Sequence, residues 1–358
     1  MERFKKMVDN FGLPNLIITG FLVVLFILTG PAGIRVDKSI TDIMFRFGIN
    51  AIMVLSMVPM IQAGCGLNFG IPVGFIAGML GSVVSLEFGV SGMAGMFLAM
   101  FFGAVFGLVF GWLYGELLNR VKGEEMVIAT YIGYVIIFLF NIFWTILPFK
   151  NPRSIQSYGG TGLRQTISLE GVWAKALDPG TVVDPLALRP DTLPVVTINN
   201  YIQIPLGMIM LFAFVAFLVW LFFKTKTGTA ITAVGSNPDY ARAAGININK
   251  MRILSVMLST AIAAIGLITY QQSFGFIEMY GAPLGFVFPT VAAILMGGAS
   301  VNKASIINVI IGTFLFQALV TMTPTVINSL IKIDLSEIIR VVVTNGLIVY
   351  ALTRRRKK

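Results

Sequence analysis

The sequence predicts an all-α polytopic membrane protein with about ten transmembrane helices in two inverted five-helix halves. Of its 358 residues, 56% are hydrophobic and only 12% are charged, whereas globular domains carry roughly 25% charged residues. The mean hydropathy is +0.87. About ten apolar runs follow one another, and a helix that crosses a bilayer needs about 20 residues. Two short runs, one in each half, occupy corresponding positions, which indicates the inverted halves.

The composition excludes several kinds of chemistry. The chain has no His and a single Cys, Cys65, so it lacks the commonest general base and metal ligand and forms no internal disulfide. Convergent carboxylates are also missing, so we expect no catalytic, metal or cofactor site. The net charge of +10 indicates loops that are retained in the cytoplasm rather than binding to nucleic acid.

The first apolar run, 13–30, follows the basic start MERFKK, as in a signal peptide. It has no A-x-A-like cleavage site, so an uncleaved first span is favoured. Further spans are predicted at 42–62, 71–86, 92–119, 127–147, 201–223, 253–273, 285–297, 305–322 and 338–352.

The distribution of Lys and Arg predicts the topology. If the first span runs outward, the start, the loops 120–122 and 224–252 and the basic tail RRRKK lie in the cytoplasm. Both termini are then cytoplasmic. We divide the chain into a first half, 1–147, an extracytoplasmic insert, 148–200, and a second half, 201–358. The insert is rich in proline and carries Trp173, which leaves open a small folded cap or a disordered loop.

The cytoplasmic stretch 224–252 contains a well-marked short helix. Asn237 is a good N-cap, Pro238 suits the first helical position, and Asp239 places negative charge at the positive helix end. The body would extend from Tyr240 to Ala244, and Gly245 can adopt the left-handed conformation that ends a helix. The alanines 241, 243 and 244 would let another protein surface approach closely, which favours docking over a merely solvated loop helix.

This stretch resembles the cytoplasmic coupling region of ABC importer permeases of the ribose, branched-chain amino acid and nucleoside group. The pattern G-x-N-P-x-x-A-x-x-x-G-I of these permeases matches Gly235, Asn237, Pro238, Ala241, Gly245 and Ile246. The later stretch PTVAAILMGGASVNKASIINVIIGTFLF resembles another segment of the same family, through Ala292, Ala293, Gly297, Gly298, Ser300 and Gly312. The resemblance implies ATPase-coupling roles for Gly235, Asn237, Pro238, Asp239, Ala241, Ala244, Gly245 and Ile246.

The resemblance also implies partners: cytoplasmic ABC ATPase subunits, a second permease copy or a related permease, and an extracytoplasmic substrate-binding protein. The sequence contains no G-x-x-x-x-G-K-[ST] motif, so ATP and Mg²⁺ would be bound by the ATPase partner. The chain would then be a transport subunit without enzymatic activity, surrounded by the lipid of a prokaryotic inner membrane and without a nucleic-acid partner.

The two short spans, 71–86 and 285–297, indicate where a passage would lie, because interrupted helices in corresponding positions of two halves mark binding sites in transporters. Each also carries a proline, Pro72 or Pro289, that frees backbone groups. The candidate passage residues are Gln62, Asn68, Phe69, Phe288, Thr290 and Met296. For Gln62 and Asn68, hydrogen bonding between helices is the alternative.

Glycines 103, 107, 111 and 115 recur every four residues on one helix face. Such a stripe permits close helix packing, either within the subunit or at a subunit interface. In the same helix, Glu116 and Arg120 are four residues apart, which predicts a local surface ion pair.

The function predicted from these features is inward movement of a small polar solute, a monosaccharide or a nucleoside, by alternating access. The alternative is a self-contained secondary transporter driven by an ion gradient, although no acidic residue lies clearly within a span. Four matters stay open: the solute, a homodimer or a heterodimer of permeases, the role of the insert, and whether Glu87 or Glu278 contacts the binding protein.

Overall fold

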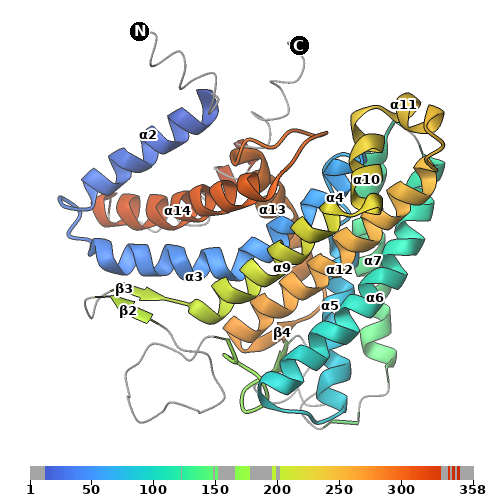
Figure 1. Cartoon of the computed structure of the whole chain (residues 1–358). Helices are drawn as coiled ribbons and strands as arrows, with labels where there is room; N and C mark the ends of the chain where they lie inside the picture. Colours follow the sequence, from blue (N-terminus) through green and yellow to red (C-terminus); the bar gives the residue numbers. More distant parts are fainter. Residues whose placement is uncertain are drawn as a thin grey trace.

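The computed structural model (Figure 1) describes residues 13–121, 123–147, 150–151, 166–177, 196–198 and 202–331, together with five single residues between 338 and 346. Its first half contains the helices α2 Leu13–Leu28, α3 Val36–Leu55, α4 Met57–Gln62, α5 Pro72–Glu87, α6 Gly92–Arg120 and α7 Glu125–Ile146. Its second half contains α9 Leu206–Lys224, α10 Lys226–Ser236, α11 Pro238–Ala243, α12 Ile248–Phe274, the 3-10 helix η1 Ala282–Phe286, α13 Val287–Met296 and α14 Ile306–Ile331.

The helices confirm a predominantly helical membrane protein. In the described residues, six helices are long and apolar enough to cross a bilayer, with α3 and α4 counted as one, and the shorter apolar helices are Ile18–Leu28, Pro72–Glu87 and Ala282–Met296. These nine segments coincide with nine of the ten predicted spans. The tenth prediction, 338–352, falls almost entirely outside the described residues. The inverted relation of the two halves stays a prediction.

The expectation of an all-α chain needs one correction, because two small antiparallel sheets are present. Strand β1 (Thr166–Ser168) pairs with β4 (Phe276–Glu278), and β2 (Val196–Ile198) pairs with β3 (Ile202–Ile204). The strands were not predicted because composition and periodicity detect long apolar helices. A three-residue strand is too short to show the alternation of polar and apolar residues that marks a strand in the sequence.

Helix α12 lies at the centre of the packing and contacts α3, α5 and α6. The glycine stripe of α6 faces it: a Cβ at Gly107 or Gly111 would overlap the backbone or side chains of Met257–Ala261. Thr260 donates a hydrogen bond from Oγ1 to the Gly107 carbonyl at 2.6 Å. The stripe is therefore used for packing within the subunit, which is the first of the two alternatives.

The two predicted short spans, 71–86 and 285–297, correspond to short apolar helices. The first is α5, which begins at Pro72 and follows α4 after an irregular segment, 63–71. In the second half, η1 and α13 follow each other directly. Helix α14 crosses α13 so closely that a Cβ at Gly297 would overlap the Asn308 carbonyl, and one at Gly312 would overlap the Ala293 carbonyl.

Figure 1 shows α10 and α11 at one end of the molecule and β4 at the opposite end. The part of the insert that the structure describes near β4, residues 166–177, is folded against the helices, and Trp173 is only 1% exposed. For these residues the structure favours the folded cap over the disordered loop. The remainder of the predicted insert lies outside the described residues, apart from 150–151 and 196–198.

Candidate functional site

The predicted coupling segment forms the short helix α11, at the exposed tip next to α10 (Figure 1). The Asn237 side chain accepts a hydrogen bond from the Tyr240 backbone N–H at 3.0 Å, as a helix cap does. Gly245 has a φ of +78° and ends the helix. Asp239 forms an exposed ion pair with Arg242 at 3.3 Å. The structure therefore has the start and the end that the sequence predicts.

Two residues of this segment pack within the chain. Ala241 is fully buried, in a helix that contacts α10 and, less extensively, α12, so its side chain is not exposed, and its coupling role stays a prediction. A Cβ at Gly235 would overlap the Gln62 carbonyl, so this glycine lets α10 approach the end of α4. The large exposed apolar side chain of α11 is Tyr240, at 69% exposure. Ala244 is exposed and Ile246 is half-buried.

Below α11, a buried polar cluster joins three segments at the same end of the bundle. Arg252, in the first turns of α12, forms an ion pair with Glu125 at the start of α7, and both side chains are at most 16% exposed. The Arg252 Nε also donates to the Cys65 sulfur at 3.3 Å. This cluster fixes the base of α12, which follows α11 in the chain, to the loop after α4.

Asn68 is fully buried, and both ends of its amide are hydrogen-bonded to other helices. Its Nδ2 donates to Ser259 Oγ at 2.9 Å, its Oδ1 accepts from the Tyr114 hydroxyl at 3.0 Å, and Ser259 donates onward to the Ser56 carbonyl at 2.6 Å. This is the arrangement expected of the alternative interpretation, hydrogen bonding between helices. The chain of bonds holds the 63–71 segment against α6 and α12.

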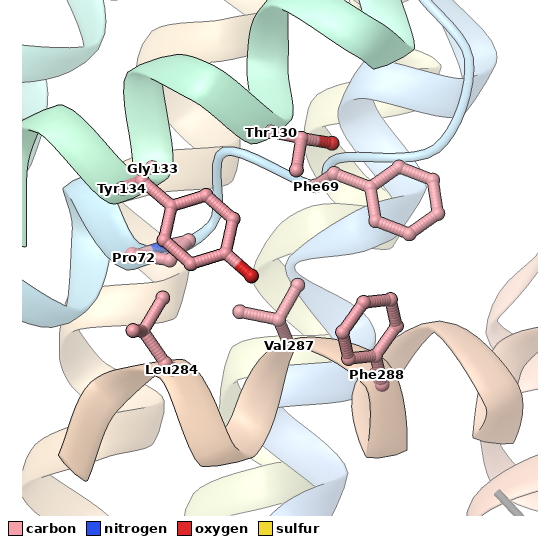
Figure 2. A pocket seen from close by; sticks show the side chains of 8 residues that line it. All are labelled: Phe69, Pro72, Thr130, Gly133, Tyr134, Leu284, Val287 and Phe288. Atoms are coloured by element: carbon pink, nitrogen blue, oxygen red, sulfur yellow. The ribbon is translucent and has the colours of Figure 1, made fainter. Parts of the chain in front are cut away.

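Three other candidate passage residues are also buried or half-buried in the helix packing. Gln62 is half-buried and donates to the Ala304 carbonyl. Thr290 is 4% exposed and donates to the Phe286 carbonyl at 2.6 Å, and Met296 is 4% exposed. Together with Asn68, these side chains are not among the walls of the pocket in Figure 2. Hydrogen bonds inside the helix packing hold the three polar ones, and a role of the four in a passage stays a prediction.

The remaining two candidates, Phe69 and Phe288, do line a pocket (Figure 2). Its space is about 270 Å³ when the adjoining open solvent is included, and its walls are Phe69, Pro72, Thr130, Gly133, Tyr134, Leu284, Val287 and Phe288. The two phenylalanine rings pack edge to face with centroids 6.2 Å apart. The pocket lies where the start of α5 meets η1 and α13, and a passage between these two segments stays a prediction.

Sequence reasoning missed the third wall, which helix α7 supplies. Thr130, Gly133 and Tyr134 are three and four residues apart, so they share one helix face. Figure 2 shows the Tyr134 ring beside the pocket with its hydroxyl directed towards Val287. Two hydroxyl-bearing residues and a glycine share one face of an otherwise apolar span, and this pattern could have indicated from the sequence that α7 lines a pocket.

None of the eight wall residues carries a charge. Among the described residues there is also no group of three or more His, Cys, Asp or Glu able to hold a metal ion. The wall consists of aromatic and aliphatic side chains with two hydroxyls, of which the Thr130 hydroxyl donates to the Met126 carbonyl at 2.9 Å. Such a wall suits a small uncharged solute that has an apolar face.

Two of the three glutamates considered from the sequence, Glu116 and Glu87, have partners within the chain. Glu116 and Arg120 form the predicted exposed pair, at 3.8 Å. Glu87 accepts hydrogen bonds from the backbone N–H groups of Lys150 and Asn151 at 3.0–3.2 Å, so it fixes the chain after α7. Glu278 is exposed at the end of β4.

A family described as "Branched-chain amino acid transport system / permease component" matches residues 39–352. The chain is 28% identical over 166 residues to the "Probable ABC transporter permease protein YphD" of Escherichia coli K12, over 45% of this chain and 48% of that protein. It is 31% identical over 159 residues to the "Nucleoside ABC transporter permease protein NupB" of Lactococcus lactis, over 44% of this chain and 40% of that protein. It is 31% identical over 102 residues to the "Autoinducer 2 import system permease protein LsrC" of Shigella flexneri, over 28% of this chain and 30% of that protein. The chain spans less than half the length of the curated relatives that it matches.

Proposed function

Because this chain belongs to the family of branched-chain amino acid transport system permease components, we propose that it is the transmembrane subunit of an ATP-driven ABC importer. Its solute is a small uncharged molecule, a nucleoside or a monosaccharide. The solute moves inward by alternating access along a passage that includes the pocket between α5, α7 and η1–α13. The chain itself binds no ATP and no Mg²⁺; both belong to its ATPase partner.

The observation that carries this proposal is the uncharged, aromatic-walled pocket at the meeting point of the two interrupted spans. An amino acid carries two charges, and burying an unpaired charge is costly. The wall offers neither charge a partner. A nucleoside or a sugar instead presents an apolar ring face to Phe69 and Phe288 and hydroxyls to Tyr134, and the nucleoside assignment of one relative supports the first of the two.

The partners follow from the two ends of the molecule. The exposed tip of α11 is the docking site of the cytoplasmic ATPase, and the end near β4 faces the extracytoplasmic binding protein. Basic residues near the α11 end, among them Arg120, Lys224, Lys250 and Arg252, support its cytoplasmic placement and that of both termini. A second permease, either a copy or a relative, completes the passage.

The test is uptake into proteoliposomes that contain this chain, its second permease and its ATPase subunits, with the binding protein outside. We expect uptake of labelled uridine or ribose that requires ATP on the cytoplasmic side and persists without an ion gradient. Labelled leucine serves as the charged comparison and should not be taken up. Uptake that an ion gradient drives without the ATPase would instead make the chain a secondary transporter and would overturn the proposal.

Replacing Tyr240 with alanine tests the docking surface. Exposed aromatic side chains often supply a large part of an interface, about 2 kcal/mol or more when they are removed. We therefore expect the affinity for the ATPase subunit to fall at least about tenfold, with ATP-driven uptake reduced in parallel and the melting temperature in detergent unchanged. Binding is measured by titrating labelled ATPase into the solubilised permease.

The matched control is Tyr131→Ala, because Tyr131 has a similar exposure of 65% but lies on α7, away from α11. It should leave ATPase binding unchanged. Equal ATPase binding in the Tyr240→Ala and wild-type chains would remove α11 as the docking surface.

A further inference from the structure

Residues 166–177, which we call the strap, tie together several helix ends beside β4. The strap begins with β1, and Leu169 then donates a backbone hydrogen bond to Gly275 at 2.8 Å. Near its end, the backbone N–H of Lys175 donates to the Gln272 carbonyl at 2.6 Å. Gly92, at the start of α6, donates to Val172 of the strap at 2.7 Å. A segment of the predicted insert thus connects the end of α12 with the start of α6.

The strap is held by apolar side chains as well as by backbone bonds. Ile167, Leu169, Trp173 and Leu177 are all at most 1% exposed. A Cβ at Gly207, in the first turn of α9, would overlap the Leu177 carbonyl, so α9 packs directly against the strap. The strap is therefore a built part of the fold.

The partner strand of the strap is connected to the pocket. β4 leads through 279–281 into η1, and Leu284 of η1 forms part of the pocket wall. A series of ring contacts also connects β4 with η1 and then with α5, between Phe276, Phe274, Tyr270, Phe286 and Phe75, with neighbouring centroids 4.4–6.2 Å apart. Displacement of β4 would therefore displace the η1 wall.

Backbone strain is concentrated in the same place. Among the described residues, the non-glycine residues with positive φ are Lys175, at 56°, and Tyr280, at 59°. Lys175 lies in the strap, and Tyr280 lies between β4 and η1. Side-chain-bearing residues rarely adopt this conformation, and where they do, the strain is often part of a moving element.

We propose that the strap and β4 form the extracytoplasmic gate of the passage. While β1 is paired with β4, η1 is held in the position seen here. When the pairing opens, β4 and η1 move away from α5 and α7, and strain at Lys175 and Tyr280 is released. Each strand has only three residues, so opening the pairing breaks few ladder hydrogen bonds. This proposal rests on the proposed transport function.

A reversible disulfide between the two strands tests the gate. Thr166 and Glu278 are directly opposite each other, and opposed Cα atoms in antiparallel strands lie about 4.5–5.5 Å apart, within the roughly 4.4–6.8 Å that a disulfide needs. In the variant Thr166→Cys/Glu278→Cys, oxidation should lower uridine or ribose uptake at least tenfold. Reduction should restore it, with crosslinking measured by mass spectrometry.

The crosslinking experiment has little interference from the chain's own cysteine, and a matched control pair is available. Cys65 is the chain's own cysteine, and burial raises the pKa of its thiol, which keeps it in the unreactive neutral form. The control is Thr197→Cys/Gln203→Cys, whose positions are opposed in the same way in β2 and β3. Oxidation of this pair should leave uptake within twofold of the reduced sample.

Full crosslinking of the 166/278 pair with unchanged uptake would overturn the gate. The proposed function fails separately, if the unmodified complex shows no ATP-dependent uptake. Hydrogen exchange on the unmodified complex needs no substitution: the amides of 166–168 and 276–278 should exchange at least threefold faster in one nucleotide state than in the others. Equal exchange in every nucleotide state would also contradict a gate that opens.

Discussion

Replacing Gly312 with alanine is expected to abolish accumulation of the folded chain in the membrane. The new methyl group would overlap the Ala293 carbonyl oxygen, and the backbone N of Gly297 would lie only 2.7 Å from it. Both atoms belong to the backbone of the α13 segment, so no side chain can rotate away. Overpacking a well-packed core typically costs 1–3 kcal/mol and occasionally more. We expect about 3 kcal/mol or more here, because α13 and α14 must separate.

The measurement is the melting temperature and the yield of monodisperse protein in detergent. Gly20→Ala is the matched control, since Gly20 also lies in an apolar helix but a Cβ added there would meet no neighbouring atom within 4 Å. The control should be neutral or slightly stabilising, because alanine favours the helix by about 1 kcal/mol relative to glycine. A Gly312→Ala chain with a wild-type melting temperature would mean that the α13–α14 crossing is looser than described.

Much of the helical framework could be predicted because its signals are local. Apolar runs of about 20 residues have few alternatives to a spanning helix in a bilayer. The glycine stripe of α6 likewise predicts a close helix contact, and the structure identifies α12 as its partner. The start and end of α11 were predictable for the same reason, since Asn237 and Gly245 act on their own neighbours.

The parts that were missed depend on partners that are distant in the sequence. Asn68 has the same polar character whether it faces a passage or a neighbouring helix, and Ser259, nearly 200 residues away, determines which of the two occurs. Ala241 is small enough for docking, but its side chain is fully buried where α11 packs beside α10 and α12. The strap required β1 and β4 to meet across more than 100 residues, and three-residue strands carry no periodic signal.

Placing a tryptophan at Leu284 is expected to reduce uptake at least tenfold while the chain folds normally. Trp substitutions at Asn68 or Met296, the positions suggested by sequence, would overpack buried sites and so confuse blockage with misfolding. Leu284 is half-buried and lines the pocket. The larger indole would add volume to the pocket wall, at a position less buried than Asn68 or Met296.

Uptake of labelled uridine and ribose is compared with membrane expression and melting temperature in the same preparations. The control is Leu113→Trp, the same substitution at an α6 position that is 51% exposed and apolar, and it should transport normally. The two substitutions add the same volume, so a difference between them reports position alone. Full uptake by a well-expressed Leu284→Trp chain would place the passage outside this pocket, and the uncharged wall would then say nothing about the solute.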